Sequence, residues 1–236
     1  MEIINIIKRI RYILLLFLDN LKFGRKKREE TFDYIYARNC WGRIDGVKYY
    51  SGSGSYKLNY VEPYCQLIKK FISEHNIVNV VDLGCGDFNV ASSFISENIS
   101  YEGIDIVQEM IEDHNKKYGS DNVHFQCLDI VEDSLPDGEL CLIRQVLQHL
   151  SNDEVISILN KVTKYKYVII TEHITKKEYA SKYNVDKSHG SYTRVYAQSG
   201  LYFDEHPFNL EIETLMKIPY YKKNKEELIS ILIKNI

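Results

Sequence analysis

The stretch Val78-Asn79-Val80-Val81-Asp82-Leu83-Gly84-Cys85-Gly86-Asp87 decides the fold of this 236-residue chain. It begins with a short apolar run, which predicts a buried strand over Val78–Leu83. Gly84 and Gly86 follow at once, and residues without a Cβ let the backbone turn tightly and approach a ligand. A strand that ends in such a turn predicts a ligand site at the carboxyl edge of a parallel sheet.

Outward from this stretch, short apolar runs alternate with helical stretches, which indicates a parallel sheet covered by helices. The length suits one α/β domain with appendages. We assign residues 1–30 to an amphipathic helix and basic linker, 31–76 to a cofactor-covering segment, and 77–236 to the core, with a substrate-side insert near 174–207. Strands are expected over Val78–Leu83, Tyr101–Ile106, Val123–Leu128, Leu140–Ile143, Tyr167–Thr171, Thr214–Ile218 and Leu228–Ile233, and helices over Asn59–Glu74, Val90–Glu97, Gln108–Tyr118 and Asp153–Thr163, the last capped by Ser151 or Asn152.

The first thirty residues carry an apolar stripe at helical spacing, from Ile3 to Leu21. The apolar run Tyr12–Leu18 is too short to span a bilayer. Basic residues lie on both sides of it, so two interpretations stay open: the helix packs on the domain or a partner, or it attaches peripherally to an anionic membrane. These basic residues are Lys8, Arg9, Arg11, Lys22, Arg25, Lys26, Lys27 and Arg28.

The overall charge and the cysteines exclude several classes of function. A formal net charge of −3 provides no global footprint for a polyanion, so nucleic acid is not the expected partner. The five cysteines are scattered without a Cys-x-x-Cys pair, which disfavours both disulfides and zinc. We expect a cytoplasmic protein, with the inner membrane surface as the alternative location.

Two further acidic residues follow the next two predicted strands. Asp105 lies 23 positions after Asp82, where a carboxylate can accept two hydrogen bonds from a ribose diol. Asp129 ends the third strand, where its side chain can accept a hydrogen bond from an adenine amino group. A nicotinamide cofactor is the competing interpretation, but its fingerprint needs a third glycine where this chain has Asn89.

These stretches resemble the first three motifs of class I S-adenosylmethionine-dependent methyltransferases: Asp82-Leu83-Gly84-Cys85-Gly86, Gly103-Ile104-Asp105 and Leu128-Asp129. The resemblance implies a Rossmann-like fold with a mostly parallel seven-stranded sheet and an antiparallel last strand. It also implies that the glycine turn holds the methionine part of S-adenosylmethionine, Asp105 the ribose, and Asp129 with Ile130 the adenine. The residues expected to bind the cofactor are Ser53, Ser55, Asp82, Gly84, Cys85, Gly86, Asp105, Ile106, Asp129, Ile130, Arg144 and Gln145.

Three other stretches resemble a subgroup of small-molecule methyltransferases: residues 51–55 (Ser-Gly-Ser-Gly-Ser), residues 144–150 and residues 207–210. Such relatives often carry Asp where this chain has Gln145, which leaves Gln145 as a hydrogen-bonding group. The serine-glycine run is either a flexible linker or a cover over the cofactor. Trp41 is expected near the cofactor or acceptor, because aromatic faces favour a cationic sulfonium.

The predicted reaction is transfer of a methyl group to a hydroxyl of a small molecule. A neutral hydroxyl needs a base, and His149 and His173 follow the fourth and fifth strands at the same sheet edge. His189 and Arg194 in the insert are expected to bind the acceptor, and no spacing requires a metal, so we expect metal-independent transfer with S-adenosylhomocysteine as product.

The resemblance implies as acceptor a sugar, nucleotide-sugar or phosphorylated precursor of a bacterial surface polysaccharide such as capsule. The alternatives are N-methylation, protein methylation, and a scaffold protein that binds the cofactor without catalysis.

Overall fold

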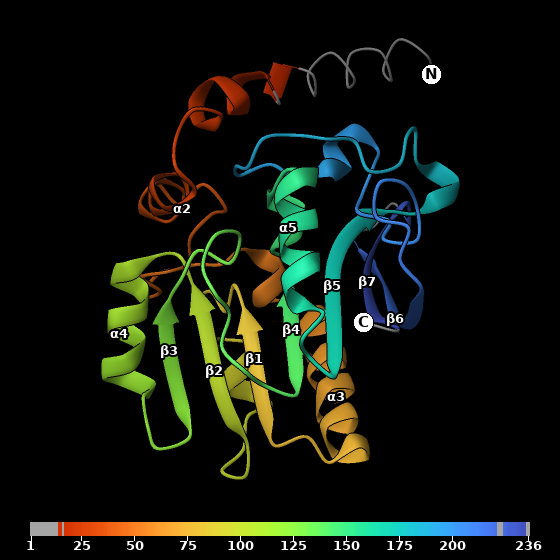
Figure 1. The fold of residues 1–236 in the computed structure, drawn as a ribbon. Coiled ribbons are helices and arrows are strands. Elements are labelled where there is room, and N and C mark those ends of the chain that lie inside the picture. Colours follow the sequence, from red (N-terminus) through yellow and green to blue (C-terminus); the bar gives the residue numbers. More distant parts are fainter. Residues whose placement is uncertain (1–13, 16, 221–223, 235–236) are drawn as a thin grey trace.

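The structure, a computed structural model, describes residues 14–15, 17–220 and 224–234. Seven strands form one sheet in the order β3-β2-β1-β4-β5-β7-β6, and only β7 runs antiparallel to its neighbours (Figure 1). This confirms the predicted fold class. The strands are β1 (Asn79–Leu83), β2 (Ser100–Asp105), β3 (Val123–Cys127), β4 (Leu140–Arg144), β5 (Tyr167–Thr175), β6 (Ile212–Tyr220) and β7 (Glu226–Ile233). The α-helices are α2 (Arg28–Ala37), α3 (Leu58–His75), α4 (Gln108–Tyr118) and α5 (Asn152–Val162). The 3-10 turns are η1 (Ser53–Ser55), η2 (Ala91–Ser93), η3 (Leu147–His149), η4 (Lys177–Tyr179) and η5 (Arg194–Ala197).

Apolar residues on the two faces of the sheet form two separate cores. Val81 and Cys141 point to the face that α5 covers, whereas their neighbours Val80 and Leu142 point to the face that carries α3 and α4. Successive side chains of a strand face opposite ways, so the continuous apolar runs of the sequence become a sheet buried on both sides. Burial on both faces leaves the carboxyl edge as the place for polar chemistry.

One predicted helix is absent. The expected helix over Val90–Glu97 is only the 3-10 turn η2, so no helix N-terminus follows the glycine turn. Phe88 adopts a left-handed backbone (φ +62°), and the Ser92 hydroxyl donates to the Asn89 carbonyl oxygen at 3.0 Å. Short polar side chains that bond to nearby carbonyl groups compete with helix formation, which accounts for the difference.

The fifth strand is longer than predicted. The sequence predicts it to end at Thr171, but β5 continues to Thr175, because β7 pairs with it as far as Thr175 opposite Glu226. That pairing partner lies some fifty positions away in sequence, so local pattern alone could not show it. The extension keeps His173 within the strand.

The N-terminal segment lies across the carboxyl edge of the sheet. Residues 14–15 and 17–23 are helical, and α2 follows directly above the ends of β2 and β3 (Figure 1). The predicted stripe from Ile3 to Ile13, with Lys8, Arg9 and Arg11, lies outside the described residues. Within the described part of the chain, every helix is too short or too polar to cross a bilayer.

The predicted N-cap of α5 is confirmed as a complete capping box. The Ser151 hydroxyl accepts from the Glu154 amide at 3.2 Å, and the Glu154 carboxylate accepts from the Ser151 amide at 2.8 Å. Each bond satisfies a backbone N–H that the first helical turn leaves unpaired.

We expect Ser151→Ala to lower the free energy of unfolding by about 1 kcal/mol, the usual cost of losing an N-cap hydroxyl. Urea unfolding followed by circular dichroism measures this change. Ser134→Ala, in an exposed loop, serves as the control and should leave the unfolding midpoint in place. Equal midpoints for the two variants would contradict the capping role.

Candidate functional site

A cavity of about 600 Å³ lies at the carboxyl edge of the sheet, between the core and the N-terminal segment. All twelve residues that the sequence predicts to bind the cofactor line this cavity, together with both candidate bases and Trp41. Most of them come from the ends of β1, β2, β3 and β4, as expected for a parallel sheet that presents its site at one edge, while Ser53 and Ser55 come from η1. The structure thus brings these residues together, although their contacts with a cofactor stay a prediction.

The glycine turn after β1 has the geometry that its sequence predicts. Gly84 and Gly86 have φ values of +78° and +55°, a backbone region that favours glycine. The Gly86 amide donates to Asp105 Oδ2 at 3.0 Å, and the Val107 amide donates to Asp105 Oδ1 at 3.2 Å. Burial raises the pKa of Asp105 to about 6. The carboxylate is therefore held at the turn, and its remaining lone pairs are suited to a diol.

The serine-glycine run over residues 51–55 is tied to this turn. The Ser51 hydroxyl accepts from the Asp87 amide at 3.0 Å, while the Ser51 amide donates to Asp87 Oδ2 at 3.0 Å. The Asn89 side-chain amide donates to the Ser55 carbonyl oxygen at 2.6 Å. The run is therefore a strap over the cavity rather than a free linker. The sequence did not point to Asp87 and Asn89, whose hydrogen bonds fasten the strap to the glycine turn.

Arg144 reaches the same strap from the end of β4. Its Nη2 donates to the Gly54 carbonyl oxygen at 2.7 Å, and its guanidinium lies 4.9 Å from the centre of the Tyr64 ring. Arg144 Nε is buried and has no hydrogen-bond partner among the described residues. An unpaired N–H on a buried cation is suited to a carboxylate oxygen, so Arg144 fits a ligand with an amino-acid end.

Gln145 follows Arg144 in a strained conformation. Its φ of +57° is unusual for a residue with a side chain, and its amide donates to the Thr171 carbonyl oxygen at 2.7 Å. The side chain packs directly against Gly54, where a Cβ would clash with it. Strained backbone of this kind clusters at functional sites, which agrees with the position of Gln145 in the cavity wall.

The adenine end of the predicted site holds an arginine that sequence reasoning missed. Arg28, at the start of α2, donates from Nε to Asp129 Oδ2 at 2.8 Å, and its two terminal nitrogens reach Glu132 and Glu154 at 2.7 and 3.0 Å. Asp129 Oδ1 also accepts from the Val131 amide at 2.9 Å. Arg28 thereby holds the N-terminal segment down over this end of the cavity. In the sequence it is one member of a basic run, with nothing to single it out.

His149 lies in an aromatic and buried environment. Its ring centre is 4.9 Å from that of Trp41, and its Nδ1 lies 3.2 Å from the Gly190 carbonyl oxygen. Because a carbonyl can only accept, Nδ1 carries the proton and Nε2 accepts from the Gln148 side-chain amide at 3.3 Å. Burial, reinforced by the Lys187 charge, lowers the pKa of His149 to about 3. His149 is neutral at physiological pH and is a weak base.

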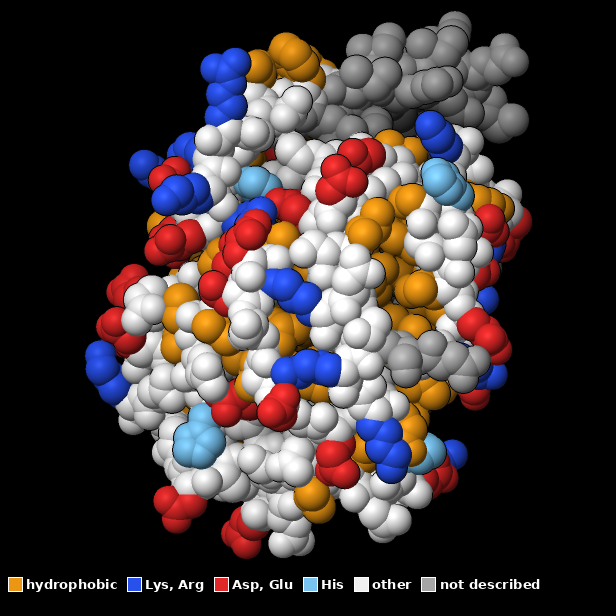
Figure 2. Space-filling model, viewed as in Figure 1, with side chains coloured by type: hydrophobic (Ala, Val, Ile, Leu, Met, Phe, Trp, Pro, Cys, Tyr) orange, Lys and Arg blue, Asp and Glu red, His pale blue; other side chains and the backbone are white. Residues whose placement is uncertain are grey.

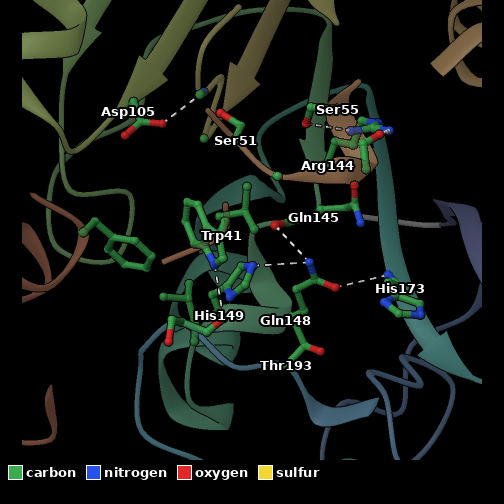
Figure 3. A pocket seen from close by; sticks show the side chains of 18 of the residues that line it. Trp41, Ser51, Ser55, Asp105, Arg144, Gln145, Gln148, His149, His173 and Thr193 are labelled. Atoms are coloured by element: carbon green, nitrogen blue, oxygen red, sulfur yellow. Dashed lines mark hydrogen bonds between the residues drawn. The ribbon is translucent and has the colours of Figure 1, made fainter. Parts of the chain in front are cut away.

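Gln148 connects the two candidate histidines. Its side-chain oxygen accepts from the His173 amide at 3.3 Å, so one glutamine contacts both His149 and the backbone of His173 (Figure 3). The His173 ring lies against Tyr220 with ring centres 3.8 Å apart, and its Nε2 is 2.9 Å from Glu226 Oε2. A carboxylate beside one ring nitrogen favours the tautomer that is protonated there. Gln148, Tyr220 and Glu226 were not predicted.

The structure does not bring His189 and Arg194 to the cavity, which corrects their predicted role in acceptor binding. Arg194 is 1% exposed, and its guanidinium donates to main-chain oxygens that include those of Leu150 and Val185. His189 Nδ1 lies 2.8 Å from Glu154 Oε1. A sequence shows a polar insert but not which side chains turn inward, so both residues organise the insert rather than face the acceptor.

The model of a family described as a methyltransferase domain matches residues 80–165. The matched residues make up less than half of the chain. The match runs from β1 to the end of α5 and leaves the N-terminal cover and the last strands outside it. A search of curated proteins found no significant match to the chain.

Solved structures share the fold of this chain at low sequence identity. Human N-acetylserotonin methyltransferase in complex with S-adenosylmethionine is 14% identical with a TM-score of 0.53, covering 89% of this chain and 61% of its own. Magnesium protoporphyrin IX methyltransferase from Synechocystis PCC 6803, with bound S-adenosylmethionine, is 13% identical with a TM-score of 0.52 over 86% and 94%. The N-terminal domain of EvdMO1, in the presence of S-adenosylhomocysteine and D-fucose, is 14% identical with a TM-score of 0.55 over 82% and 89%.

These comparisons support the expected cofactor and leave the acceptor undecided. The neighbours contain S-adenosylmethionine or its product, in agreement with the predicted cofactor. The present chain spans less than two thirds of the human enzyme. The neighbours' names refer to different substrates, so the shared fold does not select one. Among the described residues, no His, Cys, Asp and Glu side chains gather into a metal-binding group.

We expect Asp105→Ala to weaken binding of S-adenosylmethionine by roughly 1.5–3 kcal/mol, because the ribose would lose charge-assisted hydrogen bonds. Isothermal titration calorimetry measures the dissociation constant. Asp121→Ala, at an exposed position, is the control. An unchanged dissociation constant in Asp105→Ala would place the ribose elsewhere.

Cofactor affinity should also fall as the pH drops below about 6, where the raised pKa of Asp105 lets its carboxylate take up a proton. The ionised form accepts hydrogen bonds from the diol, so binding favours the higher-pH form. Calorimetry between pH 5 and pH 8, on the wild type and Asp105→Asn, separates this contribution from other groups. We expect the variant to lose affinity less steeply on acidification, and parallel curves would assign the pH dependence to another group.

Proposed function

We propose that this protein transfers the methyl group of S-adenosylmethionine to a hydroxyl of a small molecule, with a sugar, nucleotide-sugar or phosphorylated precursor of a surface polysaccharide as acceptor. The observation that carries this proposal is the single cavity that joins two sets of residues. One set is the glycine turn with Asp105 and Arg144, and the other is the group of aromatic and histidine side chains around Trp41 and His173. Cofactor and acceptor can therefore meet in one cavity.

The cofactor half of the cavity is matched to the three parts of S-adenosylmethionine. In this proposal Asp105 binds the ribose hydroxyls, the pocket beside Asp129 and Ile130 binds the adenine, and Arg144 binds the amino-acid end. When bound, the cofactor supplies a sulfonium methyl group that an acceptor oxygen attacks in line. The residues of the chain supply position, and positioning alone accounts for much of the rate in such reactions.

The acceptor half favours a polar ring with hydroxyl groups. It combines the aromatic faces of Trp41 and Tyr192 with the polar side chain of Gln148. Aromatic faces with hydrogen-bonding groups beside them are well suited to a sugar, which has apolar and hydroxyl-bearing surfaces. The EvdMO1 domain, crystallised in the presence of D-fucose, offers a precedent for a sugar beside this fold. Nucleotide-linked and phosphorylated acceptors would place the reaction in the cytoplasm.

His173 is the better candidate for the base of the two histidines. Its contact with Glu226 can stabilise the imidazolium that forms when the acceptor hydroxyl gives up its proton. The ring nitrogens of His149 contact the Gly190 carbonyl oxygen and the Gln148 amide, and neither of these is a carboxylate. With a pKa near 3, His149 is poorly matched to act as a base near neutral pH. We assign His149 to positioning, through Trp41 and Gln148. In this assignment His173 would take up the proton of the acceptor hydroxyl as its oxygen gains the methyl group, with S-adenosylhomocysteine as the other product.

We expect His173→Gln to lower kcat by about 10² to 10⁴, the usual contribution of a general base, while cofactor affinity stays near wild type. Glu226→Gln should lower kcat less and shift the pH profile, because Glu226 acts through His173. His149→Gln should retain most of the activity. Initial rates with a panel of glycan precursors, read as methylated product by mass spectrometry, test these outcomes. Wild-type rates in both His149→Ala and His173→Ala would refute histidine base catalysis.

The same assay separates the alternative functions. Methylated product from amines or peptides, with none from sugars, would indicate N-methylation or protein methylation. Cofactor binding without product from any acceptor class would indicate a scaffold protein. A set of acceptor analogues, each without one hydroxyl group, then identifies the methylated oxygen. Only the analogue that lacks the target hydroxyl stays unmethylated.

A further inference from the structure

The helical residues 14–15 and 17–23 present an apolar face to solvent. Leu14, Phe17, Leu18 and Leu21 are between 49% and 67% exposed, and Leu18, at the edge of this face, also lines the cavity. At 3.6 residues per turn these four positions fall within an arc of roughly 100°. Other exposed large hydrophobic side chains, such as Leu58, lie elsewhere on the surface. A contiguous apolar strip of this kind marks a contact surface rather than ordinary surface scatter.

The opposite side of this helix fixes its orientation. Phe23 is 1% exposed and packs against Tyr34, with ring centres 5.8 Å apart. Asp19 is 4% exposed and accepts from the Ser191 hydroxyl at 3.3 Å and the Tyr192 amide at 3.4 Å. Because these contacts hold the buried side, the apolar face cannot turn inward without breaking them.

Basic residues follow the apolar face directly, and the exposed Glu29 and Glu30 come after them in the first turn of α2. Lys22, Arg25, Lys26 and Lys27 are exposed, while Asp19, the acidic residue among positions 14–27, is buried. At the top of Figure 2, hydrophobic and basic side chains lie next to one another on this segment. The whole chain carries a net charge of −3, so this local excess of positive charge stands against the overall balance.

We propose that this helix docks on the surface of an anionic phospholipid membrane. An apolar face that enters the lipid boundary, with basic residues beside it that meet acidic headgroups, is the pattern of an interfacial helix. A second copy of the chain fits less well, because a two-fold contact through this face would bring the two basic clusters together. The same helix contributes Leu15 and Leu18 to the wall of the cavity, so docking places that wall at the membrane.

Flotation of the full chain with phosphatidylcholine vesicles, with and without phosphatidylglycerol, tests this proposal without any assay of activity. We expect binding to the vesicles that contain phosphatidylglycerol and little to the neutral ones. Leu21→Asp should lower the bound fraction at least about tenfold, since it removes a large apolar side chain from the contact. Leu58→Asp is the matched control, because Leu58 is 66% exposed and Leu21 67%.

The charge requirement is tested separately. Lys26→Glu/Lys27→Glu should abolish the preference for phosphatidylglycerol, while Lys69→Glu/Lys70→Glu, another exposed adjacent pair, should retain it. Thermal unfolding of each variant shows that it is folded. Equal vesicle binding by Leu21→Asp and the wild type would overturn the proposal. So would the absence of vesicle binding together with a dimer, seen by light scattering, that Leu21→Asp dissociates.

Discussion

The hydrogen bond from the Gly86 amide to the Asp105 carboxylate joins the ends of two neighbouring parallel strands, and the site is built around it. The bond holds the glycine turn in its left-handed conformation and buries the carboxylate at the sheet edge. From the other side, His114 Nε2 lies 2.8 Å from the Gly86 carbonyl oxygen, so α4 supports the same turn. The strap of residues 51–55 then closes over the turn through Asp87. The contacts of Asp105, His114 and the strap all require the left-handed backbone conformation of the glycine turn.

Burial of acidic groups is the energetic cost of this arrangement. Burial raises the pKa of both Asp82 and Asp105 to about 6, and that of Glu172 to about 8. Each group keeps hydrogen-bond donors: Asp82 accepts from the Tyr101 hydroxyl at 2.9 Å, and Glu172 accepts from the Leu147 amide at 2.8 Å. Glu172 thereby shapes the turn that carries Gln148 and His149. Such strained and desolvated groups belong to a site arranged for binding rather than for maximal stability.

The N-terminal segment completes the cavity and connects it to the outer surface. Arg28 ties it to Asp129, and Asp19 ties it to the insert after β5. One short segment therefore covers the proposed cofactor pocket, lines the acceptor side and presents an apolar, basic face outward. In our proposals, these features together describe an enzyme that works on precursors of surface glycans close to the membrane where such glycans are assembled.

The sequence alone determined the sheet, the glycine turn and the acidic residues at the strand ends, because these follow from periodicity and backbone chemistry within a few residues. It also predicted α4 to the residue and an N-cap for α5 at Ser151 or Asn152, which are local patterns. Only the tertiary structure decided which distant side chains meet. Arg28 and Asp129 are 101 positions apart, and His173 and Glu226 are 53 apart. Arg194 turned inward and Val90–Glu97 failed to form a helix for the same reason: packing and competing hydrogen bonds, rather than residue type, set their final positions.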